Sequence, residues 1–152
     1  IHPNDSRKFK LVVRKAEDQD CRIRGSWNLL RTAFWEVLKN SVIHSHNGEV
    51  TVTMYRSDNR VVVDIEDDGR GVAPGNDDLI FLRFFQEPAN MMSRKGKRGL
   101  GLGLFISRYI SEKHSGELRY VRHKEKGGLF RFIFPAEQAE EQVAPIEYKL
   151  GA

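Results

Sequence analysis

The sequence predicts an α+β fold, a two-layer α/β sandwich. One mixed, mostly antiparallel sheet of about five strands is expected to be covered on one face by about three helices. Two observations support this prediction. Segments 26–45 and 101–113 carry apolar residues at helical spacing, whereas segments 49–66 and 117–134 each alternate apolar and polar residues on both sides of a turn. The 152 residues, 39% of them hydrophobic, are enough for one compact core.

The N-terminal part is predicted to form two short strands followed by a helix. Strands are expected over 9–14 and 21–24, with a polar turn between them. The helix over 26–45 has a fair N-cap in Ser26, and the turn at 46–48 ends it. Its apolar stripe consists of Trp27, Leu30, Phe34, Val37, Leu38 and Ser41.

A hairpin and a short helix are predicted next. Strands over 49–55 and 60–66 are joined by a turn at 57–59. Glycines and a proline then break regular structure, and a short helix is expected over 77–86. We expect the loop that follows, through Arg98, to be mobile.

A long helix and a second hairpin complete the predicted domain. The helix over 101–113 is expected to bury the stripe Leu102, Phe105, Ile106, Tyr109 and Ile110. Strands over 117–123 and 129–134 form the last hairpin. Residues 1–136 are therefore interpreted as one domain, and residues 137–152, which turn acidic, as a tail or linker.

Composition excludes several classes of protein. The single cysteine, Cys21, cannot form an internal disulfide, and no Cys/His cluster has zinc spacing. No apolar run approaches the roughly 18 residues of a membrane span, and no signal sequence opens the chain. We therefore expect a cytoplasmic fragment without membrane contact, whether or not the parent protein is anchored. The net charge is +4, and one basic cluster consists of Arg94, Lys95, Lys97 and Arg98.

The first candidate site motif lies on the helix over 26–45. At about 100° per residue, Glu36, Asn40, Ile43 and His44 fall within one arc of roughly 100° beside the apolar stripe. A carboxylate and an amide oxygen one turn apart suit Mg²⁺, and His44 adds a donor for a phosphate. This spacing is common, however, and on its own it also fits a solvated helix flank.

The second motif, Asp67-Asp68-Gly69-Arg70-Gly71, directly follows an apolar strand. Its glycines permit close approach of the backbone to a flat ring, and a carboxylate there can accept a hydrogen bond from an exocyclic amine. The alternatives are a simple glycine-rich turn or a calcium loop. The calcium reading is poor because the longer acidic ladder ending in Glu is absent.

The third motif, Gly99-Leu100-Gly101-Leu102-Gly103-Leu104, opens the helix over 101–113 directly after the basic cluster. Unpaired backbone N–H groups at a helix N-terminus favour a polyphosphate, and the basic cluster adds positive charge. The motif is not a Walker loop, because the GK[ST] ending is missing. Taken alone, it is weak evidence.

The order and spacing of these motifs are far more specific than any one of them. With the aromatic segment 80–85 between the second and third, the sequence resembles the catalytic domain of histidine kinases, within the wider class that includes gyrase, a heat-shock chaperone and mismatch-repair ATPases. Residues 36–44 resemble its N box, 67–71 its G1 box, 80–85 its F box and 99–104 its G2 box. The resemblance spans about residues 9–135.

The resemblance implies a role for each matching residue. Asn40 would bind Mg²⁺, and Glu36 would be a second candidate for metal binding or for activating the attacking group. Asp67 would bind the adenine amine of ATP. Phe81 would anchor a mobile ATP lid over about 87–98. The adenine pocket would include Gly69, Gly71 and Val72. The residues that contact the phosphates would be His44, Arg94, Lys95, Lys97, Arg98, Gly99, Leu100, Gly101, Leu102 and Gly103.

The implied function is transfer of the ATP γ-phosphate to a histidine on a separate dimerisation and phosphoacceptor domain of the same full-length protein, with a response regulator as the indirect partner. Three departures from the family pattern stand out, the first being Leu100, which replaces the usual small hydroxyl residue of the G2 box, with Arg98 in place of a preceding glycine. Ile43 stands where many histidine kinases carry a basic residue, and Gln86 stands near where an arginine often follows the aromatics. From Ile43 and Gln86 we expect phosphate contact that is either weaker or shared with the basic cluster of residues 94–98.

Three alternatives remain open at this stage. An anti-sigma-factor serine kinase has the same fold and a similar N box. A docking module could keep the fold without turnover, which Ile43 and Gln86 alone favour. A nucleic-acid binder is least favoured, because the basic loop lacks interleaved aromatics to stack bases.

Overall fold

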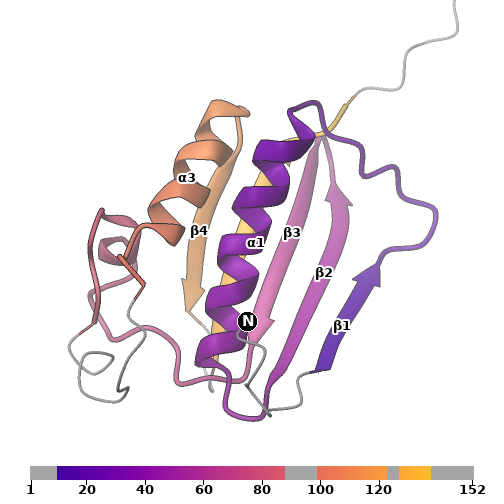
Figure 1. Ribbon diagram of the computed structural model, residues 1–152. Coiled ribbons are helices and arrows are strands. Elements are labelled where there is room, and N and C mark those ends of the chain that lie inside the picture. Colours follow the sequence, from indigo (N-terminus) through magenta and orange to yellow (C-terminus); the bar gives the residue numbers. More distant parts are fainter. Residues whose placement is uncertain (1–9, 88–98, 123–126, 138–152) are drawn as a thin grey trace, which may run out of the picture.

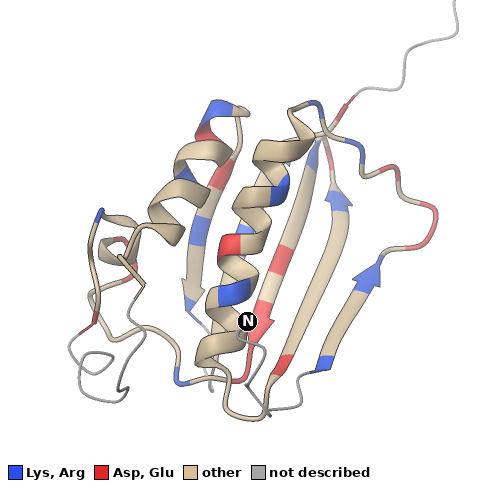
Figure 2. Ribbon diagram, viewed as in Figure 1, with Lys and Arg blue, Asp and Glu red and all other residues tan. Residues whose placement is uncertain are grey.

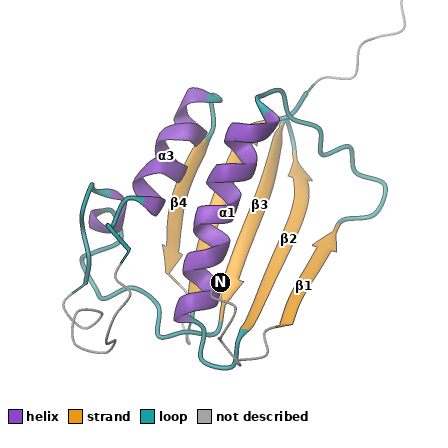
Figure 3. Cartoon of the chain, in the orientation of Figure 1, coloured by secondary structure: helices purple, strands orange, loops and turns teal. Residues whose placement is uncertain are grey.

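A computed structural model describes residues 10–87, 99–122 and 127–137. One five-stranded sheet in the order β1-β2-β3-β5-β4 carries two α-helices on one face (Figures 1 and 3). The predicted α+β sandwich is confirmed. The elements are β1 Lys10–Lys15, α1 Trp27–His44, β2 Glu49–Ser57, β3 Arg60–Asp67, the 3-10 turn η1 Leu79–Phe81, α3 Gly103–Lys113, β4 Glu117–Arg122 and β5 Gly128–Pro135.

The sheet is mixed because β1 pairs with β2 in parallel, whereas β2, β3, β5 and β4 pair antiparallel. Alternating side chains of the central strands point into the core under the helices. Phe132 and Phe134 on β5 are almost fully buried, and the Phe34 ring of α1 lies 4.5 Å from the Phe132 ring centroid. Such aromatic burial is a large part of the hydrophobic stabilisation of a domain this size.

The predicted strand over 21–24 is wrong. Cys21 and Ile23 pack against the core with their side chains, but this segment joins no sheet ladder. The N–H of Glu137, two residues after the end of β5, donates to the Arg22 carbonyl over 2.8 Å. The alternating apolar pattern therefore reflects packing of an irregular segment.

The helix predicted over 77–86 is reduced to the 3-10 turn η1. Phe84 has a φ of 64°, a left-handed conformation that an α-helix of L-residues does not accommodate. The described residues thus contain two α-helices and one 3-10 turn in place of about three helices.

Helix α3 occurs where predicted but buries a different side. The most buried residues are Ser107, Ile110 and Ser111, whereas Tyr109 is 52% exposed. Small residues allow α3 to approach α1 so closely that the Ser107 hydroxyl donates to the Ala33 carbonyl over 2.9 Å. Within the predicted stripe Ile110 is buried as expected, but Ile106 and Tyr109 are exposed, because contact between the helices through small side chains replaces burial of these large ones.

The two helices are also joined at the other end. The backbone N–H of Ser26, the N-cap of α1, donates to His114 Nε2 over 3.1 Å. Helix α1 therefore has a fixed direction relative to α3, and its C-terminal half and the start of α3 lie at the same end of the molecule (Figure 1).

Charged positions are spread over both layers (Figure 2). Acidic positions on β3 include Asp64, which forms a two-bond ion pair with Arg131 of β5 at 2.7 Å per bond. Neither described helix is long and apolar enough to cross a membrane.

Candidate functional site

A cavity of about 710 Å³ opens where α1 ends, α3 begins and β3 reaches its last residue. Its size suits a small-molecule ligand. It brings together residues from all three predicted motifs. The predicted site residues that line it are Glu36, Asn40, His44, Asp67, Gly71, Val72, Gly99, Leu100, Gly101, Leu102 and Gly103.

Asp67 forms the inner end of this cavity. It is the last residue of β3 and is 6% exposed, and its Oδ1 accepts hydrogen bonds from the backbone N–H groups of Gly69 at 2.9 Å and Gly128 at 3.2 Å. These two bonds hold the carboxylate in one orientation. Gly69 itself must lack a side chain, because a Cβ there would collide with the His44 carbonyl.

Burial raises the pKa of the Asp67 carboxyl above its usual 3.8, although the N–H groups of Gly69 and Gly128 and the nearby Ser41 hydroxyl lower it. The Ser41 hydroxyl is fully buried and close enough to the Asp67 carboxyl to lower its pKa, but it meets no described residue in full hydrogen-bond geometry. A buried carboxylate beside a buried, unpaired hydroxyl is typical of a binding site rather than of a structural ion pair.

This raised pKa predicts a pH-dependent stability. As the pH rises from 3.8, the unfolded chain releases the Asp67 proton first. The free energy of unfolding therefore falls as the pH rises to the higher pKa that Asp67 has in the folded state. This loss of stability persists at higher pH. Asp67→Asn removes the penalty, so at neutral pH this variant is expected to have a higher urea midpoint than wild type. The gain should shrink as the pH falls toward 3.8.

Urea denaturation at pH 7 and pH 5 measures this difference. Asp68→Asn is the matched control, because Asp68 is less buried than Asp67 and its carboxylate accepts hydrogen bonds from the backbone N–H groups of His46 and Asn47. It should lower stability at both pH values. A lower midpoint for Asp67→Asn at neutral pH would contradict the prediction.

The opposite wall of the cavity is the flank of α1. Glu36, Asn40, Ile43 and His44 all line it, as their helical spacing predicted. Glu36 pairs with Lys39 at 2.7 Å, while no described residue hydrogen-bonds to the Asn40 side-chain amide. The amide of Asn40 is thus available to a ligand.

The glycine-rich segment closes the cavity beside this flank. Gly101 has a φ of 68°, and a Cβ on it would meet the backbone of Phe84 and Phe85. A Cβ on Gly103 would lie 2.7 Å from Glu36 Oε2, so α3 starts in close contact with the carboxylate on α1. The left-handed φ and the backbone contacts at Gly101 require glycine, whereas a Cβ at Gly103 would displace the flexible Glu36 carboxylate.

Several predicted residues lie elsewhere. Gly69 adjoins the cavity without lining it. Phe81 lies in the core, 3% exposed, with its ring 6.4 Å from that of Phe130. Arg94, Lys95, Lys97 and Arg98 lie outside the described residues, as does the predicted lid after Glu87.

Other lining residues were not identified from the sequence. Tyr120 and Phe130 of the second hairpin reach the cavity, and the Tyr120 hydroxyl accepts a hydrogen bond from the Val72 N–H at 3.1 Å. Lys39 also lines it. Its i,i+3 spacing from Glu36 was a usable signal, whereas the hairpin residues belong to no motif and are brought there only by the pairing of β5 with β3.

The cavity wall offers oxygen ligands for a metal ion. The described residues contain no group of three or more His, Cys, Asp and Glu able to hold an ion. Mg²⁺ is, however, commonly held by one or two protein oxygens together with water and phosphate. Asn40 and Glu36, one helical turn apart on one cavity wall, fit that mode.

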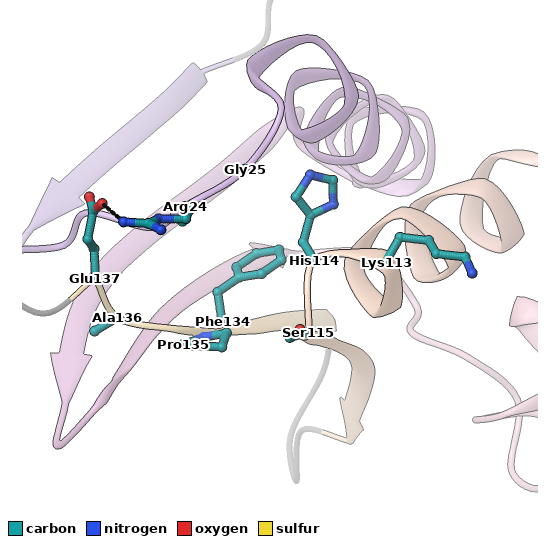
Figure 4. Close-up of a pocket in the computed structure, with 9 residues that line it drawn as sticks. All are labelled: Arg24, Gly25, Lys113, His114, Ser115, Phe134, Pro135, Ala136 and Glu137. Atoms are coloured by element: carbon teal, nitrogen blue, oxygen red, sulfur yellow. Dashed lines mark hydrogen bonds and ion pairs between the residues drawn. The ribbon is translucent and has the colours of Figure 1, made fainter.

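A second hollow, of about 520 Å³, lies at the other end of both helices (Figure 4). The ion pair of Arg24 and Glu137 lies along its edge, at 3.4 Å. Both nitrogens of the His114 ring are engaged, one by the Ser26 N–H and the other by the Ile110 carbonyl at 2.7 Å. This hollow contains none of the predicted site residues.

The fold and the site agree with a known family. Residues 25–138 match the family model described as histidine kinase-, DNA gyrase B-, and HSP90-like ATPase. The chain belongs to this family.

Its relatives are sensor kinases. The chain is 28% identical over 127 residues to the sensor-like histidine kinase SenX3 of Mycobacterium tuberculosis, covering 83% of this chain and 30% of SenX3. It is 35% identical over 108 residues to the sensor protein ChvG of Agrobacterium fabrum, covering 67% of this chain and 18% of ChvG. The chain thus spans less than a third of these relatives.

Solved structures agree with the sequence relatives. The mycobacterial sensor histidine kinase MprB superposes with a TM-score of 0.70 at 26% identity, covering 86% of this chain and 84% of the other. Full-length ShkA, solved in complex with AMPPNP, gives a TM-score of 0.68 at 27% identity, covering 85% of this chain and 26% of ShkA.

Proposed function

We propose that this chain binds ATP with Mg²⁺ and transfers the γ-phosphate to a histidine on a separate dimerisation and phosphoacceptor domain of the same full-length protein, within a two-component system. One observation carries the proposal. The side chains of Asn40 and Asp67 and the backbone of Gly101, which lie far apart in the sequence, line one cavity in a domain of this ATPase family.

The adenine end of the nucleotide is assigned to Asp67. Its Oδ1 already accepts two backbone N–H groups, which leaves Oδ2 to accept the exocyclic amine. Gly71 and Val72 would form one side of the ring pocket, and Tyr120, held by the Val72 N–H, the other.

The phosphate end is assigned to the start of α3. The unpaired N–H groups at a helix N-terminus and the helix dipole stabilise negative charge, and Gly99–Gly103 line the cavity at this point. Asn40, with Glu36 as second ligand, would hold Mg²⁺, which neutralises phosphate charge when bound. His44 would donate to a phosphate oxygen. Phosphoryl transfer requires little more of the protein than positioning and charge neutralisation.

The phosphoacceptor is assigned to another domain. Among the described histidines, His44 and His46 line the nucleotide cavity, and His114 uses both ring nitrogens to join α1 to α3. We further propose that residues 1–136 act as the catalytic domain, with a lid over about 87–98, and that residues 137–152 are a linker.

The test is phosphotransfer from labelled ATP to the parent protein's purified phosphoacceptor domain. Acid-labile, base-stable label is expected, which is characteristic of phosphohistidine. Acid-stable label on a serine of a partner would support the anti-sigma-factor kinase, and binding of ATP without transfer would support a docking module. Absence of ATP binding in calorimetry would refute the site assignment.

A further inference from the structure

Two hydrogen bonds join the segment after η1 to the glycine-rich loop. The Phe84 N–H donates to the Gly101 carbonyl over 2.9 Å, and the Gln86 side-chain Nε2 donates to the Gly99 carbonyl over 2.6 Å. Gln86, Gly99 and Gly101 all line the cavity. The bond from Gln86 requires the amide side chain at that position. The bond from Phe84 uses only the backbone and does not depend on which side chain is present.

These bonds fix the orientation of two peptide groups. In a trans peptide, the N–H of the next residue points opposite to the carbonyl, and the described residues contain no cis peptide. A carbonyl held at Gly99 therefore fixes the direction of the Leu100 N–H. Without such a bond, glycine permits rotation of this peptide at little cost.

The orientation matters for a polyanion. A backbone N–H attracts phosphate, whereas a carbonyl oxygen, with its partial negative charge, repels it. Occupying the Gly99 carbonyl with the Gln86 amide removes an acceptor from the set of groups that a phosphate can meet. Gln86 was expected only to weaken phosphate contact, but its observed bond suggests a different role.

Gln86 is itself held in place by its neighbour. Glu87 is 8% exposed, and its Oε1 accepts the Ala73 N–H at 2.8 Å and the Asn76 Nδ2 at 3.1 Å. Its Oε2 lies 3.6 Å from an Arg70 nitrogen. The backbone at Gln86 is thus attached to the loop that follows β3, on the side of the cavity assigned to adenine.

We propose that Gln86 is a positioning residue that holds the Gly99–Leu100 peptide in the orientation that binds the phosphates. This inference rests on the proposed function. It assigns Gln86 no contact with ATP itself. The consequence is a selective effect on ligands that carry phosphates.

Gln86→Met tests the proposal, because methionine has a similar length but no N–H donor. Binding of adenosine, ADP and a non-hydrolysable ATP analogue is measured by NMR titration. We expect roughly five- to tenfold weaker binding of ADP and of the ATP analogue, as for loss of one hydrogen bond, with adenosine affinity changed less than twofold. Gln19→Met is the matched control, since Gln19 also bonds to a backbone group, the Arg56 N–H, but away from the cavity. It should leave all three affinities unchanged.

Each outcome has a distinct meaning. An equal loss for all three ligands in Gln86→Met would show general damage to the site and overturn the proposal, as would unchanged affinities. If the wild-type chain binds neither ADP nor the ATP analogue, the proposed function itself fails. If wild type binds them and Gln86→Met does so equally well, only the role of Gln86 is refuted.

Discussion

Replacing Asp67 with asparagine is expected to weaken ATP binding about 100-fold. A hydrogen bond to a charged group is worth roughly 1.5–3 kcal/mol, and its loss alone gives an effect of this order. Oδ1 of the new side chain can still accept the Gly69 and Gly128 N–H groups. The other atom becomes an NH₂ donor that faces the adenine amine, also a donor. Calorimetric titration with a non-hydrolysable ATP analogue measures the loss.

The control is again Asp68→Asn, one residue along the chain. The Asp68 carboxylate accepts a hydrogen bond from the Asn47 side-chain amide at 2.7 Å. Asp68 does not line the cavity. Its ATP affinity should stay within about threefold of wild type, since only an exposed contact is lost. Wild-type affinity in Asp67→Asn would show that the adenine lies elsewhere. Together with the stability prediction, the expected pattern for Asp67→Asn is a more stable protein with much weaker ATP binding.

Asn40→Ala is expected to abolish the part of ATP affinity that depends on Mg²⁺. It should also reduce phosphotransfer by about 100-fold or more, because a reactant misplaced by about 1 Å loses rate on this scale. Asn40 supplies an amide oxygen to the cavity wall beside Glu36. Without it, Glu36 would remain, but its carboxylate is already paired with Lys39. The measurement is the ratio of the Kd in EDTA to the Kd in Mg²⁺, for wild type and variant.

Asn28→Ala is the matched control for this variant. Asn28 lies in the first turn of α1, exposed and distant from the cavity. Wild-type Mg²⁺ dependence is expected. A Kd ratio in Asn40→Ala that equals the wild-type ratio would assign the metal to other residues.

The parts of the fold that could be predicted are those with a strong local pattern. Helix α1 and both hairpins follow from periodicity, because most of the apolar residues in their patterns face one continuous core, although Trp27 of the predicted α1 stripe is exposed. The segment over 21–24 and the helix over 77–86 failed for different reasons. In the first, Cys21 and Ile23 are apolar and partly buried without pairing to another strand. In the second, the left-handed φ of Phe84 is a tertiary feature that no local pattern signals.

The candidate site shows the same division. The motif residues were identifiable because chemistry restricts which residue types can stand at each spacing. Tyr120 and Glu87 were not, because each reaches the site through a contact distant in sequence, with Val72 and Ala73 respectively. The bond from Gln86 to Gly99 likewise spans 13 positions and depends on the loop conformation.

Strand β1 has a practical consequence for any shortened form of the protein. The match to the family begins at residue 25, yet Lys10–Lys15 pair in register with Glu49–Met54 of β2. Truncation at the family boundary would turn β2 into an outer strand with a row of unsatisfied backbone donors and acceptors. An exposed strand edge of this kind promotes aggregation. Recombinant fragments intended for solution measurements should therefore retain the first strand.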